Sequence, residues 1–311
     1  MDTEGTKPKI IVICGPTGIG KTSAALELAK NLQAEIVSAD SMQVYRYMNI
    51  GTAKPTADEL NRVPHHMIDI VNPDEPFDAA RFSEMAQEVI ATLHAGQILP
   101  LVVGGTGLYI KSLVHGLFRM PKAGQTIRSR LKAEAAIHGV GFLHQQLQAC
   151  DPETAVKLHP NDTYRIIRAL EIYETTGNPL SGYHRKHRFK DMPYRVLKIG
   201  LRMDREILYE RINRRVDAMI REGFLEEVKR LLDMGYSESL KSMQSIGYRH
   251  MVDYIKSRFS WDEAIRTLKR DTRRFAKRQF TWFRADSEIA WVEPDRLNDI
   301  HRLVNSFLND I

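Results

Sequence analysis

Residues 15–22 constrain this chain more than any other feature, because their sequence, GPTGIGKT, satisfies the pattern GxxxxGK[ST]. They follow KIIVIC at 9–14, a continuous apolar run typical of a buried parallel strand, and precede a helical pattern at 23–32. A glycine-rich turn in this context aims backbone N–H groups and the positive end of a helix at phosphate oxygens. The sequence therefore predicts a diphosphate or triphosphate site, where Lys21 supplies a cation and the Thr22 hydroxyl is a ligand for Mg²⁺.

The pattern around this loop predicts an α/β fold. Short strands are expected at 35–40 and 98–105, with a helix at 81–96 between them. Such alternation is typical of a parallel sheet covered by helices. Residues 125–176 have an almost entirely helical pattern, and strand signals return at 195–201 and 289–293. We therefore expect an α/β core formed by residues 1–120 and 193–311, with a helical insertion domain at 121–192.

Composition and charge narrow the class of protein. Of 311 residues, 43% are hydrophobic and 27% charged, as in ordinary globular proteins, and the two cysteines rule out a disulfide framework or a cysteine-based zinc site. The apolar run near the N-terminus is too short for a signal peptide or a membrane span, so we expect a soluble cytoplasmic protein without a membrane partner. The net charge of +6 divides into −3 for residues 1–120 and +9 for the rest. This asymmetry indicates a polyanionic partner or a set of solvated basic helices, and charge alone does not separate the two.

Asp40 is the acidic residue best placed to act beside the phosphate loop. A typical P-loop NTPase has a second strand that ends in Asp, but the strand at 98–105 runs into GGTG without a carboxylate. Asp40 ends the strand at 35–40, and ligands of such sheets bind at the carboxyl ends of the strands. We therefore expect Asp40, Thr106 and the phosphate loop to converge on one crevice. An isolated Asp after a strand is more often a turn cap, and the convergence favours a catalytic role.

Several further stretches carry a family resemblance. They are DSMQVYRYMNIGTAKP at 40–55, PHHMIDI at 64–70, VGGTGLY at 103–109, HPNDTYRIIRALEIYETTG at 159–177, SIGYR at 245–249 and KRQFTWFR at 277–284. Together with the phosphate loop, they resemble tRNA dimethylallyltransferase, also called tRNA isopentenyltransferase, in order and over nearly the whole chain. Eukaryotic relatives often carry a C-terminal zinc finger. This chain has no Cys/His cluster there, and so it is similar to the bacterial type.

The resemblance implies a P-loop-kinase-like core that transfers a dimethylallyl group from dimethylallyl diphosphate to the exocyclic amine of the adenine 3′ of the anticodon in tRNA. It implies Mg²⁺ as cofactor, the tRNA anticodon stem-loop as partner and, in our expectation, a monomer. The implied catalytic residues are Asp40, Lys21 and Thr106. The implied residues for the donor's diphosphate are Gly15, Pro16, Thr17, Gly18, Ile19, Gly20, Lys21 and Thr22, with Thr22 as the metal ligand. The implied tRNA contacts are Asp40, Ser41, Met42, Gln43, Thr106, Arg128, Tyr164, Arg165, Ile166, Ile167, Arg168, Gln244, Ser245, Ile246, Gly247, Tyr248 and Arg249.

A basic helix near the C-terminus fits a role in RNA binding. Lys and Arg recur at spacings of three and four, with Asp271 as the nearby acid, at positions Arg266, Lys269, Arg270, Arg273, Arg274, Lys277 and Arg278. We expect Phe275 and Trp282 to pack on the core, away from this face. Three alternatives remain open at this stage: a prenyltransferase for free adenine nucleotides, a P-loop nucleotide kinase or ATPase, and a non-catalytic RNA-binding protein.

Overall fold

The structure is a computed structural model that describes residues 7–116, 125–187 and 192–310. Its strands are β1 (Lys9–Cys14), β2 (Ala34–Ser38), β3 (His65–His66), β4 (Leu99–Gly104), β5 (Arg195–Leu201) and β6 (Ile289–Val292). Its helices are α1 (Lys21–Ala29), α2 (Ala57–Arg62), α3 (Ala79–Ala95), α4 (Gly107–His115), α5 (Gln125–His138), α6 (Val140–Cys150), α7 (Pro152–Lys157), α8 (Thr163–Thr176), α9 (Leu180–His187), α10 (Arg205–Arg221), α11 (Phe224–Asp233), α12 (Tyr248–Ile255), α13 (Trp261–Arg284) and α14 (Leu297–Asn309).

The strands form one parallel sheet in the order β3-β2-β4-β1-β5-β6, which confirms the predicted α/β class. β1 lies inside the sheet, where Ile11 is opposite Leu101 of β4 and Leu197 of β5. The edge strand β3 has no counterpart in the sequence-based prediction. Two histidines give no strand signal, and pairing with β2 alone defines them as a strand.

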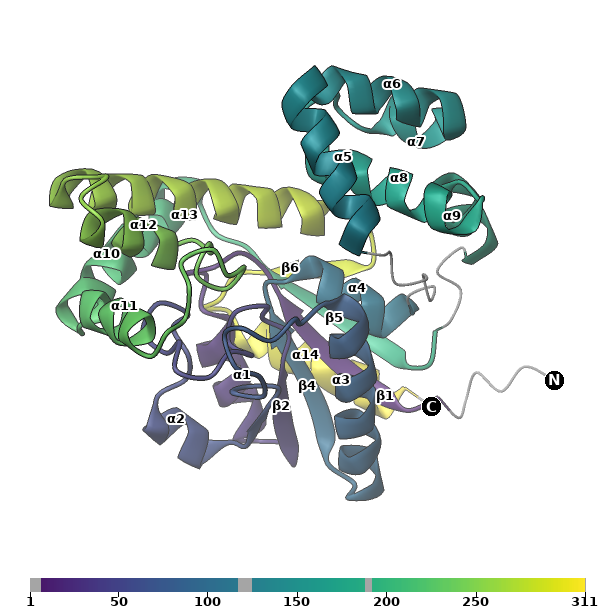
Figure 1. The fold of residues 1–311 in the computed structure, drawn as a ribbon. Coiled ribbons are helices and arrows are strands. Elements are labelled where there is room, and N and C mark those ends of the chain that lie inside the picture. The colour runs from purple at the N-terminus through teal and green to yellow at the C-terminus, as the bar shows by residue number, and fades with distance from the viewer. Residues whose placement is uncertain (1–6, 117–124, 188–191, 311) are drawn as a thin grey trace. The chain divides into compact units, whose positions relative to one another are not determined.

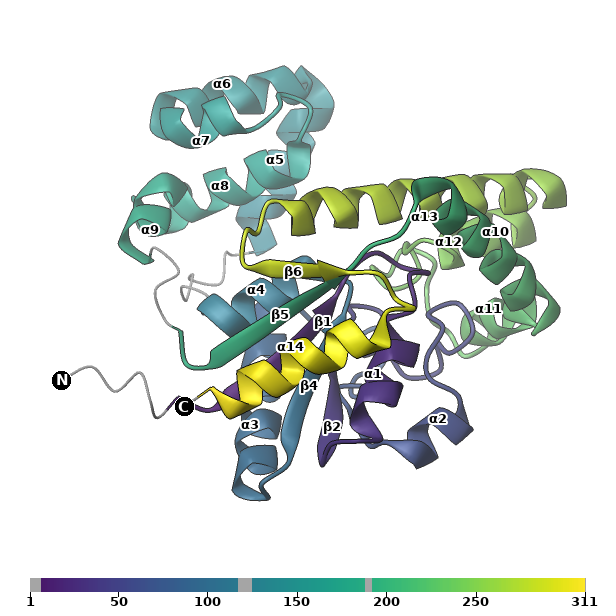
Figure 2. The ribbon, with the colours of Figure 1, turned by 180° about the vertical axis from the view of Figure 1, so that it is seen from behind.

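Helices cover both faces of the sheet. Figure 1 shows α3 on one face, and Figure 2 shows α14 and α1 on the other. Because side chains alternate along a strand, Ile11 and Ile13 point together to the face covered by α1 and α14. Both are fully buried there, in a cluster that includes Leu28, Ile300 and Val304. Burying each such side chain contributes about 1.5–3 kcal/mol.

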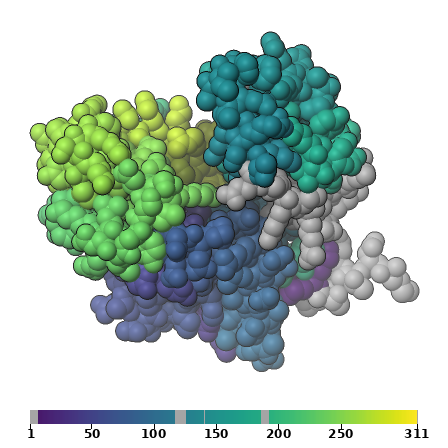
Figure 3. Space-filling model, viewed as in Figure 1, coloured from purple at the N-terminus to yellow at the C-terminus, as the bar shows by residue number. Residues whose placement is uncertain are grey.

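The C-terminal helices α10 to α12 lie over the loops that follow the N-terminal strands. Figure 3 shows their side chains packed directly against the segment around residues 40–75. Ser242 donates a hydrogen bond from Oγ to the carbonyl of Pro73 at 2.7 Å, and Glu227 accepts bonds from the 49–51 turn. Sequence-distant helices therefore close over the carboxyl edge of the sheet.

The chain divides into two compact units, Met1–Val114 with Met192–Ile311, and His115–Asp191. The predicted boundary between residues 120 and 121 falls in 117–124, outside the described residues. The second unit contains α5 to α9, whose helices pack around Leu131, Leu143, Leu147, Ile166 and Leu170. Within the described ranges, none of the helices has the length and apolarity that crossing a membrane requires.

Candidate active site

The phosphate loop has the backbone that an anion site needs. Gly18 and Gly20 have φ values of 79° and 105°, in the left-handed region that favours glycine. Helix α1 begins at Lys21 without a side-chain N-cap, so its first N–H groups keep their capacity for a ligand. The helix dipole adds positive potential at the same point.

The eight residues of the predicted phosphate site divide into two groups. Thr17, Gly18, Gly20, Lys21 and Thr22 line a cavity of about 700 Å³. The other three, Gly15, Pro16 and Ile19, are buried and are not among the residues that line the cavity. Because a phosphate loop binds anions through backbone N–H groups, the predicted donor contacts of these three residues stay predictions.

The cavity is strongly cationic. In the part of the chain that the structure describes, Asp40 is the one acidic residue among those lining it. Five basic residues line it: Lys21, Arg211, Arg214, Arg215 and Arg278. A concave site with this balance favours a polyanionic ligand.

Asp40 belongs to this site and also caps a turn. Its Oδ1 accepts hydrogen bonds from the backbone N–H groups of Met42, at 2.8 Å, and Gln43, at 3.3 Å. Within the described residues its Oδ2 has no hydrogen-bond partner. The turn-capping and catalytic interpretations are therefore compatible, because different oxygens serve them.

Lys21 and Arg215 lie within electrostatic range of Asp40. Burial lowers the pKa of Lys21 to about 8; Asp40 opposes this shift and Arg215 adds to it. Burial likewise lowers the pKa of Arg215, again against the influence of Asp40. In this structure Lys21 Nζ donates to the carbonyl oxygen of Pro16 at 2.9 Å.

Thr106 fixes the segment that follows Asp40. Its Oγ1 accepts a hydrogen bond from the backbone N–H of Ser41 at 3.0 Å. Two residues earlier, a Cβ on Gly104 would lie 2.1 Å from the carbonyl oxygen of Ala39. Because the two backbones pass this closely, no carboxylate can occupy this last position of β4.

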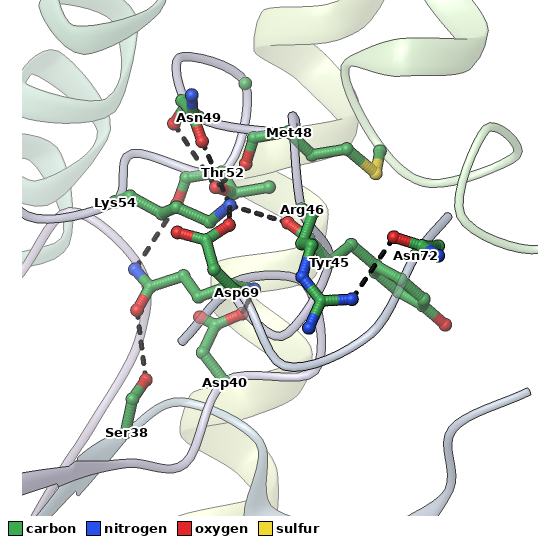
Figure 4. A network of polar contacts seen from close by, with 12 residues as sticks. Ser38, Asp40, Tyr45, Arg46, Met48, Asn49, Thr52, Lys54, Asp69 and Asn72 are labelled. Carbon is green, nitrogen blue, oxygen red and sulfur yellow. Dashed lines mark hydrogen bonds and ion pairs between the residues drawn. The ribbon is translucent and has the colours of Figure 1, made fainter. Parts of the chain in front are cut away.

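The 41–55 segment is held by a polar network beside Asp40, which Figure 4 shows. Gln43 accepts a bond from Ser38 Oγ at 3.0 Å and donates to the carbonyl of Ala53 at 3.2 Å. Lys54 donates to the carbonyl of Tyr45 and to Asp69, both at 2.6 Å. Ala53 and Asp69 have positive φ values, so this network stabilises a strained backbone. Gln43 therefore shapes the cavity wall that it also lines.

The predicted contact stretch 244–249 is only partly accessible. Gln244, Ser245, Ile246 and Gly247 line the cavity, whereas Tyr248 is fully buried. The Tyr248 hydroxyl donates to Glu227 at 2.7 Å. The predicted tRNA contact of Tyr248 stays a prediction, and in this structure its side chain packs inside the protein.

Glu227 connects that stretch to the opposite wall of the cavity. Besides the Tyr248 hydroxyl, its buried carboxylate accepts the backbone N–H groups of Asn49, Ile50 and Gly51 at 2.8–3.1 Å. A Cβ on Gly51 would lie 2.2 Å from the Phe224 ring, so only glycine allows this approach.

The insertion unit has a hollow of its own. A pocket of about 260 Å³ is lined by Arg128, Lys132, Thr163, Tyr164 and Ile167. Tyr164 and Arg165 are exposed, as a contact surface requires, whereas Ile166 is fully buried in the hydrophobic core, and Ile167 belongs to that core and also lines the pocket. The predicted tRNA contacts of these two isoleucines stay predictions.

The basic face of α13 is more extensively paired than its sequence indicates. Lys269 forms an ion pair with Asp217 at 2.6 Å, and Arg266 forms one with Glu263. Arg273 donates to Asn213 at 2.6 Å. Lys277, Arg274 and Arg278 remain exposed. The expectation of Asp271 as the one nearby acid is wrong, because Glu263 lies on α13 itself and packing brings in Asp217 of α10.

Neither expected core aromatic of α13 is fully buried. Trp282 is 44% exposed, and its ring lies over Gly107, where a Cβ would meet it at 2.2 Å. Phe275 lines the cavity instead of the core. By contrast Tyr45, Tyr109 and Phe82 are core residues, with Phe82 and Tyr109 stacked at 4.4 Å between ring centroids.

Three residues that line the cavity are not among the predicted site residues. Arg215 is one of several arginines in α10, and Gln279 reaches the phosphate loop from α13. His65 carries its proton on Nδ1, 2.7 Å from the carbonyl of Val63, which leaves Nε2 as a buried acceptor without a partner in the described ranges. His65 lies in the stretch PHHMIDI at 64–70, but no residue pattern predicted that this side chain lines the cavity.

Residues 43–286 match the IPP transferase family. The chain belongs to this family.

The similarity to known proteins extends over nearly the whole chain. A tRNA dimethylallyltransferase of Desulfosudis oleivorans is 52% identical over 97% of each chain. The tRNA isopentenylpyrophosphate transferase of Bacillus halodurans is similar in structure, with a TM-score of 0.74 and 43% identity over 98% of each chain. A eukaryotic dimethylallyltransferase, solved acting on tRNA, has a TM-score of 0.83 at 27% identity and covers 97% of this chain and 80% of its own. The cavity described above thus belongs to an IPP transferase.

Proposed function

We propose that this protein transfers a dimethylallyl group from dimethylallyl diphosphate to the exocyclic amine of the adenine 3′-adjacent to the anticodon in tRNA, releasing diphosphate. The observation that carries the proposal is one cavity that joins a phosphate loop, several cations and the carboxylate of Asp40, in a member of the IPP transferase family. The relatives named above act in tRNA modification, as their names state.

The phosphate loop and the neighbouring cations form the donor half of the site. The α1 N-terminus, Lys21 and Arg215 stabilise the negative charge that grows on the departing diphosphate. Because these groups are fixed before the donor binds, little reorganisation is needed during the reaction. The loop's role as a diphosphate site does not require ATP hydrolysis.

The chemistry of the site fits Mg²⁺ better than a softer metal. Among the residues that the structure describes, no group of three or more His, Cys, Asp or Glu side chains could hold a metal ion. Thr22 provides a hard hydroxyl oxygen beside the phosphate loop, and the donor's own oxygens complete such a site. Bound Mg²⁺ would neutralise charge on the diphosphate, with Thr22 as its protein ligand.

Asp40 is the proposed general base of the acceptor half. The amine nitrogen attacks C1 of the donor, the C1–O bond breaks with its electron pair passing to the diphosphate, and the amine proton passes to Asp40. The aromatic amine is a weak nucleophile, so proton removal contributes about 10²–10⁴-fold to the rate. Thr106 acts by holding Ser41 in place beside this carboxylate.

The acceptor base has to leave its stack to reach Asp40, as in other enzymes that modify bases within folded nucleic acids. Ser41 to Gln43 and Gln244 to Gly247 line the cavity and are the proposed contacts to the extruded base and its neighbours. Arg128, Tyr164, Arg165 and Arg168 of the insertion, with Arg249, are the proposed contacts to the anticodon stem-loop. The enzyme would act as a monomer in the cytoplasm, where tRNA is modified.

The rival functions have less support. A nucleotide kinase would need a carboxylate at the end of β4, where the close approach of Ala39 to Gly104 excludes any side chain. A free-nucleotide prenyltransferase would have no use for a basic insertion unit. A non-catalytic RNA-binding protein would not need Asp40 beside a phosphate loop.

One assay separates these functions. The protein is incubated with labelled dimethylallyl diphosphate and unmodified tRNA, and separately with AMP or ATP as acceptor. Label in tRNA and none in free nucleotides is the expected result. Transfer from γ-labelled ATP, or prenylation of AMP alone, would contradict the proposal.

A further inference from the structure

Glu171 of α8 is a buried acid that holds two arginines of the insertion unit. Its side chain is 1% exposed. Arg128 of α5 donates to it from Nε and, at 2.8 Å, from Nη2, while Arg168 donates from Nη1 at 3.4 Å. Both guanidinium groups keep part of their surface in solvent. The Nη1 group of Arg128 has no hydrogen-bond partner within the described ranges.

Asp271 of α13 gathers arginines in the core unit in the same way. Arg249 of α12, which packs against α13 (Figure 1), donates to its Oδ2 at 2.7 Å. Arg270 donates from Nε to Oδ1 at 2.9 Å, and Arg274 lies 3.9 Å from the same oxygen. His250 accepts the Gly247 N–H at Nδ1, so its Nε2 donates to Asp271 at 3.2 Å.

Asp271 is held in its ionised, negatively charged form. Burial alone raises its pKa, but the hydrogen bonds from Arg270, His250 and Arg249 outweigh burial and lower the pKa to about 2. The carboxylate is 13% exposed, whereas the side chains of Arg249, Arg270 and Arg274 are 40–65% exposed. The acid is thus covered by the cations that it holds.

A carboxylate repels phosphate, so an acidic residue among arginines that bind RNA must have a compensating role. A free arginine loses rotamer freedom when it binds phosphate, and this loss weakens binding. An arginine whose guanidinium group is already held by a carboxylate lost that rotamer freedom when the protein folded. Its remaining N–H groups then point in a set direction.

We propose that Glu171 and Asp271 are positioning residues for tRNA: each carboxylate fixes a group of arginines, Arg128 with Arg168 and Arg249 with Arg270 and Arg274, in orientations that receive backbone phosphates. The inference rests on the proposed function, because it explains how the arginines that would contact tRNA are held in place. Neither carboxylate touches the tRNA.

A purely electrostatic effect and a positioning effect predict opposite changes in tRNA affinity when either carboxylate is replaced by a neutral amide. Glu171→Gln and Asp271→Asn each remove one negative charge, which by electrostatics alone tightens tRNA binding. If the carboxylates position arginines, each variant weakens tRNA binding by about 3- to 10-fold, and the slope of log Kd against log salt becomes shallower. The effect falls on the KM for tRNA, with the KM for dimethylallyl diphosphate unaffected. Equal or tighter tRNA binding overturns the proposal.

Matched controls carry the same charge change without a buried arginine anchor. Glu174→Gln lies one turn from Glu171 and loses a half-exposed pair with Arg130. Glu263→Gln lies on α13 and loses an exposed pair with Arg266. Both should bind tRNA as the unaltered protein does, or slightly more tightly. Weakening as large as that of the test variants would mean that any charge change disturbs binding, and would also overturn the proposal.

A double-mutant cycle separates positioning from a general loss of structure. In the Arg128→Ala/Arg168→Ala background, Glu171→Gln should cause no further loss of tRNA affinity, since its effect passes through those arginines. A further loss of the same size would show that Glu171 acts on the fold instead. If the unaltered protein itself neither binds nor prenylates tRNA, the proposed function fails. If it does both and Glu171→Gln changes nothing, the positioning role alone fails.

Discussion

Gln279 accepts a hydrogen bond from the backbone N–H of Thr17 at 2.9 Å, and its side-chain amide donates to the carbonyl of Gly105 at 2.7 Å. One buried side chain of α13 thus joins the phosphate loop to the end of β4. Because this bond occupies the Thr17 N–H group, the donor's phosphates have to be bound by the backbone N–H groups of the residues that follow Thr17. Helix α13 therefore helps to set the shape of the donor site.

We expect Gln279→Glu to impair donor binding more than its stability change explains. A carboxylate cannot donate to Gly105, and it places negative charge beside the phosphate loop. The KM for dimethylallyl diphosphate should rise by about 10-fold or more, whereas Gln279→Met should mainly destabilise the fold, by about 1–3 kcal/mol, because it leaves buried polar groups unpaired. Steady-state kinetics and urea unfolding measure the two effects, and an unchanged KM in Gln279→Glu would contradict this role.

Asp40→Asn should abolish most of the chemistry and keep the fold. The asparagine Oδ1 can still accept the N–H groups of Met42 and Gln43, so stability should change by less than about 1 kcal/mol. Single-turnover transfer should fall by about two to four orders of magnitude, because no general base remains. tRNA affinity should hardly change, since phosphate contacts dominate it. A near-normal transfer rate in Asp40→Asn would exclude Asp40 as the base.

Donor affinity should decrease as the pH rises through about 8. Below this pKa, Lys21 is protonated and attracts the diphosphate; above it, the free enzyme holds a neutral amine. Since a bound diphosphate raises the pKa of Lys21, binding near pH 8–9 should take up a proton. Calorimetry of inorganic diphosphate binding in buffers of different ionisation enthalpy measures that uptake. Lys21→Arg, which stays charged, should flatten the pH dependence, and a flat profile in the unaltered protein would argue against the role of Lys21.

Arg215→Ala should weaken donor use, although this residue lies in a part of the chain without a recognised motif. Loss of a half-buried cation near Asp40 removes charge stabilisation from the leaving diphosphate, so kcat/KM for the donor should fall by about 10²-fold. Arg221→Ala, an exposed change on the same helix, serves as the control. Equal kinetics for the two variants would show that Arg215 does not contact the donor.

Removal of divalent metal should stop turnover. EDTA treatment followed by magnesium-free buffer should eliminate transfer, and Mg²⁺ should restore it, because Thr22 offers a hard oxygen ligand. tRNA affinity at fixed ionic strength provides the control, since the metal acts at the donor site. Full activity in the metal-free buffer would refute the metal prediction.

Local sequence determined the framework of this protein. Continuous apolar runs specified β1 and β4, and the glycine spacing in residues 15–22 specified the loop between β1 and α1. These signals are readable because strand burial and turn geometry act over a few residues. Parallel pairing then brings the carboxyl ends of β1, β2 and β4 to one edge, so the meeting of Asp40 and Thr106 with the phosphate loop also followed from sequence.

Tertiary structure alone decided which side chains complete the site. Thr17 and Gln279 are 262 positions apart, and Glu227 reaches the 49–51 turn across 176 to 178 positions. No local pattern encodes such contacts, because the packing of α10 to α13 over the sheet edge brings them together. The same packing buries Tyr248 within a stretch that sequence indicated as a contact surface. Residue identity gave the chemistry available to this chain, and long-range packing decided which groups face the cavity.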